Sequence, residues 1–192
     1  ALQGQHFRAS AGYGVKSFSL NYVPNESYPG NIGGVVKGMA EAEFERYLFY
    51  RFYLAGKAEY LLHNREDVLF GGPVNFNQAE LSGMLGLQWP KWGIYAGVKG
   101  GRIWDIEINS KSYQGEQEWM PPQQFEAAYT TALSGGIKYY VFNFLRFQAE
   151  LNYGLEQPAG IRPREKLNRQ PAFRSFDFNP VSLSVGISIS IP

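Results

Sequence analysis

Apolar and polar residues alternate along much of the chain, most clearly from Pro180 to Ile191. Every odd position from Val181 onward is a branched aliphatic residue, and every even position is Ser or Gly. A period of two residues is typical of a β-strand whose two faces meet different surroundings. The run is also about as long as a tilted strand needs to be to cross a bilayer. We therefore predict a membrane-spanning strand at this position.

The same alternation recurs along the chain and predicts eight strands in total. They lie at about residues 7–16, 36–44, 54–62, 79–88, 92–101, 126–138, 145–153 and 181–191. In the first of them the apolar positions change phase after Lys16 and become Phe18, Leu20 and Tyr22. An extra residue in one strand of a pair has this effect, so we expect a β-bulge near Gly14.

The charged residues indicate which face of the strands meets lipid. The basic residues on the polar face are Arg8, Lys16, Lys37, Lys57, Lys99, Lys138 and Arg146, and the acidic ones are Glu41, Glu43, Glu45, Glu59, Glu80, Glu126 and Glu150. The apolar face carries no charge, except Arg102 if the fifth strand keeps its phase. Balanced charges can pair with one another in a narrow lumen, as buried charges must. The interior of an eight-stranded barrel is just wide enough for side chains to fill it.

The connections between the predicted strands alternate between short and long. The short ones, near residues 48–51, 90–91 and 141–143, are crowded with aromatic residues. Tyr and Trp favour the membrane–water interface, so we predict an aromatic girdle at periplasmic turns. Its expected members are Tyr47, Tyr50, Phe52, Trp89, Trp92, Tyr139, Tyr140, Phe142 and Phe144. The long connections, at about residues 21–34, 63–77, 109–124 and 156–176, are then external.

The prediction is an all-β protein, an eight-stranded antiparallel up-and-down transmembrane β-barrel that forms one domain over residues 1–192. The mean hydropathy of −0.30 agrees with it, because only alternate residues of a barrel strand face lipid. The absence of cysteine excludes disulfides and a cysteine nucleophile. The chain begins at Ala1 without a signal sequence, so we expect a mature exported form. The alternative is a soluble, lipocalin-like or avidin-like cup, which requires an apolar lumen and a polar exterior.

With the strands assigned, the chain resembles the outer-membrane β-barrel domain family, the PorT-like small barrels of Gram-negative bacteria. The resemblance rests on the segments 9–14, Ala55–Tyr60, Leu145–Tyr153 and Pro180–Ile191. It implies eight antiparallel strands, a periplasmic N-terminus and an outer-membrane location. We expect both termini to be periplasmic. The family includes accessory parts of secretion and assembly machines, so the resemblance implies no single activity.

Few residues suggest catalysis or metal binding. The two histidines, His6 and His63, have no serine at a suggestive spacing, and Glu41 and Glu43 have lysines on neighbouring strands with which to pair. Asp105 and Glu107 lack a third ligand for calcium. We therefore predict a protein that is not an enzyme and that uses no cofactor or metal.

Two of the long connections are candidates for contacts with partners. One carries Trp119 beside Met120, and the other carries the cations Arg162, Arg164, Lys166 and Arg169. Guanidinium groups bind phosphate well, so this loop could meet lipopolysaccharide or an acidic partner, and the near-neutral chain gives no sign of nucleic-acid binding. We predict a non-catalytic accessory or structural subunit of an outer-membrane secretion or assembly complex, in contact with lipid, lipopolysaccharide and other outer-membrane or periplasmic proteins. The alternatives are an outer-membrane lipid-modifying enzyme and a narrow channel.

Overall fold

The computed structural model describes residues 7–24, 30–61, 74–108, 123–156 and 173–191. Within these residues it contains nine β-strands. They are β1 (Phe7–Pro24), β2 (Gly30–Phe49), β3 (Phe52–Leu61), β4 (Val74–Gln88), β5 (Trp92–Ile108), β6 (Gln123–Phe125), β7 (Ala128–Phe142), β8 (Leu145–Glu156) and β9 (Phe173–Ile191). None of the described segments is a helix long and apolar enough to cross a membrane.

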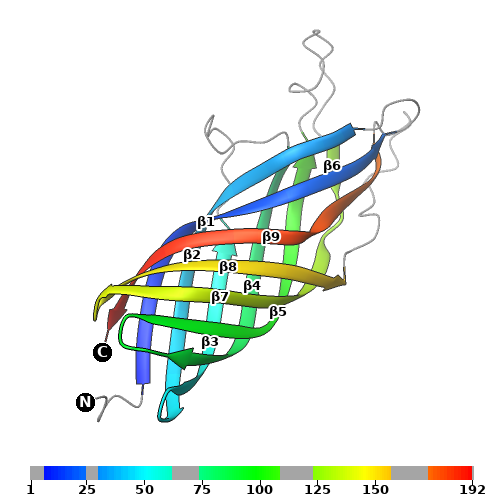
Figure 1. Ribbon diagram of the computed structural model, residues 1–192. Helices are drawn as coiled ribbons and strands as arrows, with labels where there is room; N and C mark the ends of the chain where they lie inside the picture. The colour runs from blue at the N-terminus through cyan, green and yellow to red at the C-terminus, as the bar shows by residue number, and fades with distance from the viewer. Residues whose placement is uncertain (1–6, 25–29, 62–73, 109–122, 157–172, 192) are drawn as a thin grey trace.

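The strands form one closed antiparallel barrel (Figure 1). Each strand pairs with its neighbours in sequence, and β1 closes the ring by pairing with β9 from Ala9–Ile191 to Pro24–Phe173. The three-residue strand β6 pairs with β5 just beyond the β5–β7 ladder, so β6 and β7 act as one interrupted strand. The predicted eight-stranded up-and-down barrel is therefore confirmed.

The two ends of the barrel differ in their connections. Three short turns join β2 to β3, β4 to β5 and β7 to β8, at the positions expected from the sequence. The turn at Tyr50 and Arg51 has two residues, and Tyr50 adopts a positive φ of 50°, as tight hairpin turns require. The start of β1 and the end of β9 lie at this same end, which we call the turn end (Figure 1).

Side chains alternate between a polar lumen and an apolar exterior. In β3 the burial alternates at every residue, with Lys57 and Glu59 buried and Leu54 exposed. Leu81 is 70% exposed and Ile189 is 59% exposed, and similar aliphatic side chains cover the outer wall of the barrel. Soluble proteins rarely expose continuous apolar surface of this extent, whereas lipid requires it. This arrangement is the reverse of a soluble cup and excludes that alternative.

The irregularities of β1 lie further along the strand than the sequence suggested. Gly14 is in regular register with Met39 and Gly186, so the expectation of a bulge near Gly14 was wrong. The register instead shifts between Phe18 and Leu20 on both sides of β1. On the β2 side the extra residue falls in the Gly33–Gly34 pair, and on the β9 side the shift spans Pro180, which has no N–H to donate to a ladder.

A second bulge lies in β5. The β4–β5 register shifts between Asn75 and Asn77, and Asp105 has a positive φ of 52°. Asp tolerates this left-handed conformation better than most residues, and its carboxylate accepts a 3.1 Å hydrogen bond from the Asn77 side chain. The bulge changes the phase of the strand, so that both Ile103 and Ile106 are buried.

The narrow lumen predicts that a side chain larger than hydrogen is poorly tolerated at Gly136. A Cβ atom at this position would lie 2.5 Å from the backbone oxygen of Ala149 and 2.6 Å from the Tyr95 ring. We expect Gly136→Ala to lower the free energy of unfolding in urea by about 1–3 kcal/mol, because the overpacked ring has to move.

The matched control for this substitution is Gly56→Ala on the outer wall, where a Cβ atom would have nothing within 4 Å. We expect a change within about 0.5 kcal/mol for the control. Equal losses for the two variants would show that the lumen is not tightly packed at Gly136.

Candidate functional site

The charged lumen is the feature that sets this barrel apart chemically. Among the described residues, six acidic and six basic side chains inside it are no more than 7% exposed. They are Glu41, Glu43, Glu45, Glu59, Glu80, Glu150, Lys16, Lys37, Lys57, Lys99, Lys138 and Arg146. Burying so many charges is costly unless they pair and bond to one another. Most of them pair in two ionic clusters.

One ionic cluster lies near the turn end and connects β2 with β7 and β8. Arg146 donates from its two terminal nitrogens to Glu43 at 2.7 Å and to Glu45 at 2.9 Å, and from Nε to Ser188 at 2.6 Å. Lys138 bonds both carboxylates as well, at 2.7 Å for Glu45. These two cations and two anions form a closed quartet. We call it the turn-end cluster.

Other groups extend the turn-end cluster toward the rim of the barrel. The Arg8 guanidinium lies 3.8 Å from the Glu45 carboxylate and 5.0 Å from the centre of the Tyr140 ring. The Tyr47 hydroxyl donates at 3.0 Å to Oε2 of Glu45, the same oxygen that Arg8 approaches. Glu45 therefore has four polar partners and is fully buried.

A second cluster lies further up the barrel and joins five strands. Glu150 of β8 reaches Lys57 of β3 at 2.5 Å and also bonds Lys99 of β5, and Glu59 pairs with the same two lysines. Glu80 of β4 bonds Lys16 of β1 and lies 3.9 Å from Lys99. We call this group the central cluster.

The central cluster neutralises a row of like charges. Glu41, Glu59 and Glu80 are direct cross-strand neighbours on β2, β3 and β4. Like charges directly opposite one another destabilise a sheet. The lysines of the central cluster lie among these carboxylates, and Glu41 also accepts a hydrogen bond from the Gln148 amide. Glu59 and Glu80 of the acidic row are thus paired with lysines, and Glu41 is bonded to a neutral amide.

Two tyrosine rings lie beside cations of the two clusters. Tyr53 and Tyr95 pack with Ala55 and Met84, and Lys138 lies 5.0 Å and 4.9 Å from the centres of the two rings. Tyr95 also contacts the central cluster, because its hydroxyl donates to Glu150 at 2.8 Å and Lys57 lies 5.8 Å from its ring centre. The rings therefore fill part of the lumen and together lie beside cations of both clusters.

Toward the end opposite the turns the lumen becomes apolar. Met39, Leu61, Phe76, Ile103, Ile106 and Phe125 are each no more than 2% exposed. Lys37 lies in this region, 5.3 Å from the centre of the Phe76 ring. In the described part of the chain, filled layers thus follow one another from the turn end to the opposite end.

Three residues predicted from the sequence lie elsewhere than expected. Glu126 was predicted to face the lumen, but it is exposed in the break between β6 and β7, where the alternation of the strand is interrupted. Tyr47 and Tyr140 were predicted to lie in the girdle, but they belong to the lumen face. Their rings are needed there beside Arg8. The strand phase that carries the lysines and glutamates continues to these tyrosines.

The other predicted girdle residues surround the turn end from outside. Tyr50, Phe52, Trp92, Tyr139, Phe142 and Phe144 are exposed, and Trp89 is half-buried. The rings of Trp89 and Trp92 stack with their centres 4.3 Å apart, and those of Phe142 and Phe144 stack with their centres 5.5 Å apart. The predicted contact residues Trp119, Arg162, Arg164, Lys166 and Arg169 lie outside the described residues, as do His6 and His63.

Charge reasoning alone missed the neutral members of the network. Tyr95, Gln148 and Ser188 each bond a charged lumen residue. Their positions on the polar face could have indicated this, since each alternates with outward aliphatic residues in the same strand. Among the described residues, no group of three or more His, Cys, Asp or Glu side chains is arranged so that it could hold a metal ion. The arrangement pairs most of the buried charges with one another and fills the described part of the lumen.

The fold and the charged lumen define a class, the small eight-stranded transmembrane β-barrels of the kind found in bacterial outer membranes. Ail, the attachment invasion locus protein of Yersinia pestis, was solved in complex with the heparin analogue sucrose octasulfate. The similarity covers 97% of this chain and 100% of the Ail chain, with a TM-score of 0.53 and a sequence identity of 11%. A second structure of Ail has a TM-score of 0.52 and a sequence identity of 10%, with the same coverage of the two chains.

Another small barrel is similar over nearly the whole chain. The N-terminal β-barrel domain of Pseudomonas aeruginosa OprF matches over 98% of this chain and 100% of its own, with a TM-score of 0.47 and 14% identity. No family model matches the chain, and no curated protein does. Identities this low show a shared fold only. The resemblance to PorT-like barrels therefore stays a prediction.

Glu150 offers a direct test of the central cluster, because it pairs with two lysines from other strands. We expect Glu150→Leu to lower the free energy of unfolding in urea by about 3–5 kcal/mol, since it leaves buried cations short of a partner. The double variant Glu150→Leu/Lys57→Met should recover part of the lost free energy of unfolding, because the effects of two residues in contact are not additive.

Arg46→Gln is the control for this pair, because Arg46 is exposed on the outer face beside the Phe7 ring. Its effect should stay within about 0.5 kcal/mol. An unchanged midpoint for Glu150→Leu would rule out the central cluster as a structural element.

Proposed function

We propose that this chain is an integral protein of a bacterial outer membrane that serves as a non-catalytic accessory or structural subunit of a larger outer-membrane complex. The observation that carries the proposal is the filled lumen. Paired charges and aromatic rings occupy the interior, so the surfaces left for function are the outer wall and the connections at the ends of the barrel.

The dimensions of the outer wall support the membrane location. Trp92 at the turn end and Arg102 lie ten residues apart on the outer face of β5. At about 3.3 Å per residue and a tilt of about 40°, this separation is about 25 Å across the membrane, the height of the apolar band of outer-membrane barrels. Exposed aromatic residues mark both levels, Trp92 at one and Tyr129 at the other. We propose that the short turns are periplasmic, which would put the start of β1 and the end of β9 on the periplasmic side as well.

The channel alternative conflicts with the occupancy of the lumen. Glu150 spans the interior to reach Lys57 and Lys99, and Arg146 spans it to reach Glu43 and Glu45. An ion moving through would have to break these pairs and displace the Tyr53 and Tyr95 rings beside them. Each step would leave buried charges without partners.

The absence of conduction is a testable consequence. We expect the purified barrel to show no stepwise conductance in planar lipid bilayers at neutral pH and moderate salt, because paired side chains fill the described part of the lumen. Single-channel recording checks this. Reproducible unitary currents from the folded protein, absent in samples denatured before addition, would restore the channel reading.

The accessory role is tested by its partner. Gentle extraction from the native outer membrane, followed by size-exclusion chromatography and mass spectrometry, should show a protein that co-migrates at fixed stoichiometry. As a control, the extraction is repeated with purified Glu150→Leu barrel added. This variant should compete poorly with the wild-type barrel for the partner, because its fold is destabilised. A barrel that elutes alone at every detergent concentration tried would contradict the proposal. Lipid turnover lost in a His63→Ala variant would favour the enzyme instead.

A further inference from the structure

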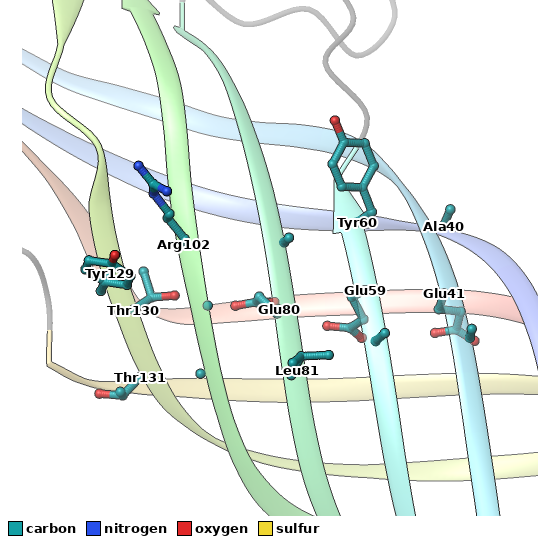
Figure 2. A pocket seen from close by; sticks show the side chains of 15 residues that line it. Ala40, Glu41, Glu59, Tyr60, Glu80, Leu81, Arg102, Tyr129, Thr130 and Thr131 are labelled. Carbon is teal, nitrogen blue, oxygen red and sulfur yellow. The ribbon is translucent and has the colours of Figure 1, made fainter.

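The outer wall is not uniformly convex. A groove of about 940 Å³ runs across β2, β3, β4, β5 and β7 on the lipid-facing side (Figure 2). Its lining includes the outward-facing residues Ala42, Ala58, Gly100, Tyr60, Arg102 and Tyr129, and also Glu41, Glu59 and Glu80, whose carboxylates are buried in the lumen. We call it the outer-wall groove. Its volume is at the upper end of the range of about 300–1,000 Å³ for ligand sites.

The strand register orders this groove into two levels. Tyr60, Ala79, Arg102 and Tyr129 are successive cross-strand neighbours in one row, and Ala58, Leu81, Gly100 and Thr131 are neighbours in the next. Figure 2 shows Arg102 and Tyr60 in the upper row, with Leu81 and Thr131 below them. The upper row carries a charge and phenolic rings, and the lower row is apolar apart from one hydroxyl. Polarity therefore changes along the groove as it does from the headgroup to the acyl chains of a lipid.

Arg102 is a cation on a wall that is otherwise apolar at this level. It is exposed, and its guanidinium lies 5.9 Å from the centre of the Tyr129 ring. Within the described part of the chain, no ion pair joins it to an acidic side chain, and Asp105 on the same strand bonds Asn77 instead. A guanidinium at the boundary of the hydrocarbon region is stabilised by an anion that lies at the same depth.

The small outward-facing residues of the lining are not required by packing within the chain. A Cβ atom at Gly100 would meet nothing within 4 Å, and the same holds for Gly83, which lines an adjoining hollow of about 570 Å³. The two hollows share Leu81, Gly100 and Thr131, so they are continuous. Glycines inside the lumen relieve crowding, whereas Gly100 and Gly83, like Gly56 beside Gly83, leave open space on the outer wall.

We propose that the outer-wall groove is a specific binding site for lipid A, the phosphorylated anchor of lipopolysaccharide, with a phosphate at Arg102 and an acyl chain over Gly100 and Ala58. The inference rests on the proposed outer-membrane location and orientation, which place this end of the barrel in the outer leaflet. Arginine binds phosphate through paired hydrogen bonds, and the Tyr60 and Tyr129 rings suit the interface.

A second apolar hollow on the outer wall shows what distinguishes this groove. It has a volume of about 530 Å³ and is bordered by Tyr13, Ile137, Phe147 and Ile187, with no charged side chain in its lining. Ordinary membrane lipid suffices to cover such a surface. The combination of open space and an outward cation at the interface is found in the described residues at the outer-wall groove.

The experiment is native mass spectrometry of the whole barrel in mild detergent, titrated separately with diphosphorylated lipid A, dephosphorylated lipid A and phosphatidylglycerol. We expect one bound diphosphorylated lipid A per barrel, and weaker binding of the other two lipids. Arg102→Gln should weaken binding about tenfold, as the loss of charge-assisted hydrogen bonds to phosphate predicts. Gly100→Leu should weaken it as well, because the side chain fills the groove.

Two substitutions serve as matched controls. Arg46→Gln removes an exposed outer-face arginine at the turn end, and Gly135→Leu places a side chain on β7 outside the lining of both the groove and the adjoining hollow. We expect both to bind lipid A as the wild type does. Unchanged binding in Arg102→Gln, equal losses in Arg46→Gln, equal retention of phosphatidylglycerol, or a second copy of the chain occupying the groove would each overturn the proposal.

Failure of this inference is distinguishable from failure of the proposed function. Folding of each variant is read from its heat-dependent migration on gels, and the accessory role from the co-migrating partner of the wild type. A barrel with a stoichiometric partner and no lipid A preference would leave the accessory role standing and remove the lipid site. A barrel that binds lipid A but has no stoichiometric partner would leave the lipid site standing and remove the accessory role.

Discussion

The structure depends on ion pairs that cross the lumen. In the ring of eight strands, β3 and β8 lie four places apart, as do β2 and β7, so the Lys57–Glu150 and Glu43–Lys138 pairs join opposite walls. Each charge is removed from water, and the cost is offset only because every carboxylate of the two clusters has cations within reach. This constraint explains why the lumen residues are long lysines, arginines and glutamates. Shorter side chains could not meet across the interior.

The width of the lumen follows from the same constraint. Tyr53 and Tyr95 together lie beside cations of both clusters, and lumen-facing glycines lie beside them. A Cβ atom at Gly86 would overlap the Tyr53 ring, and one at Gly136 would overlap the Tyr95 ring. An interior packed in this way has little room for water or solutes. The consequence for function is that specificity has to reside on the outer wall and at the ends of the barrel, which is why Arg102 is of interest.

The accuracy of the sequence-based picture varied with the kind of signal. The alternation in the last strand and the aromatic turns predicted the number of strands, their faces and the three tight connections, because one face must meet lipid and the other must not. The same rule placed Arg102 on the outer face. It failed at Glu126 because the strand is interrupted there, and at Tyr47 and Tyr140 because a tyrosine suits both a wet interface and a buried hydrogen-bonded position. Composition could not separate these two environments.

The sequence by itself determined a closed transmembrane barrel and the set of charges inside it, because the period of two and the sign balance are local properties of each strand. The tertiary structure decided which charges pair. Glu150 meets Lys57 and Lys99, 93 and 51 residues away, only after the ring has closed and the tilt of the strands has set their relative height. The outer-wall groove likewise exists only once five strands bring Ala42, Ala58, Gly100 and Arg102 into adjacent rows. Cross-strand register is a long-range property, and no single segment contains it.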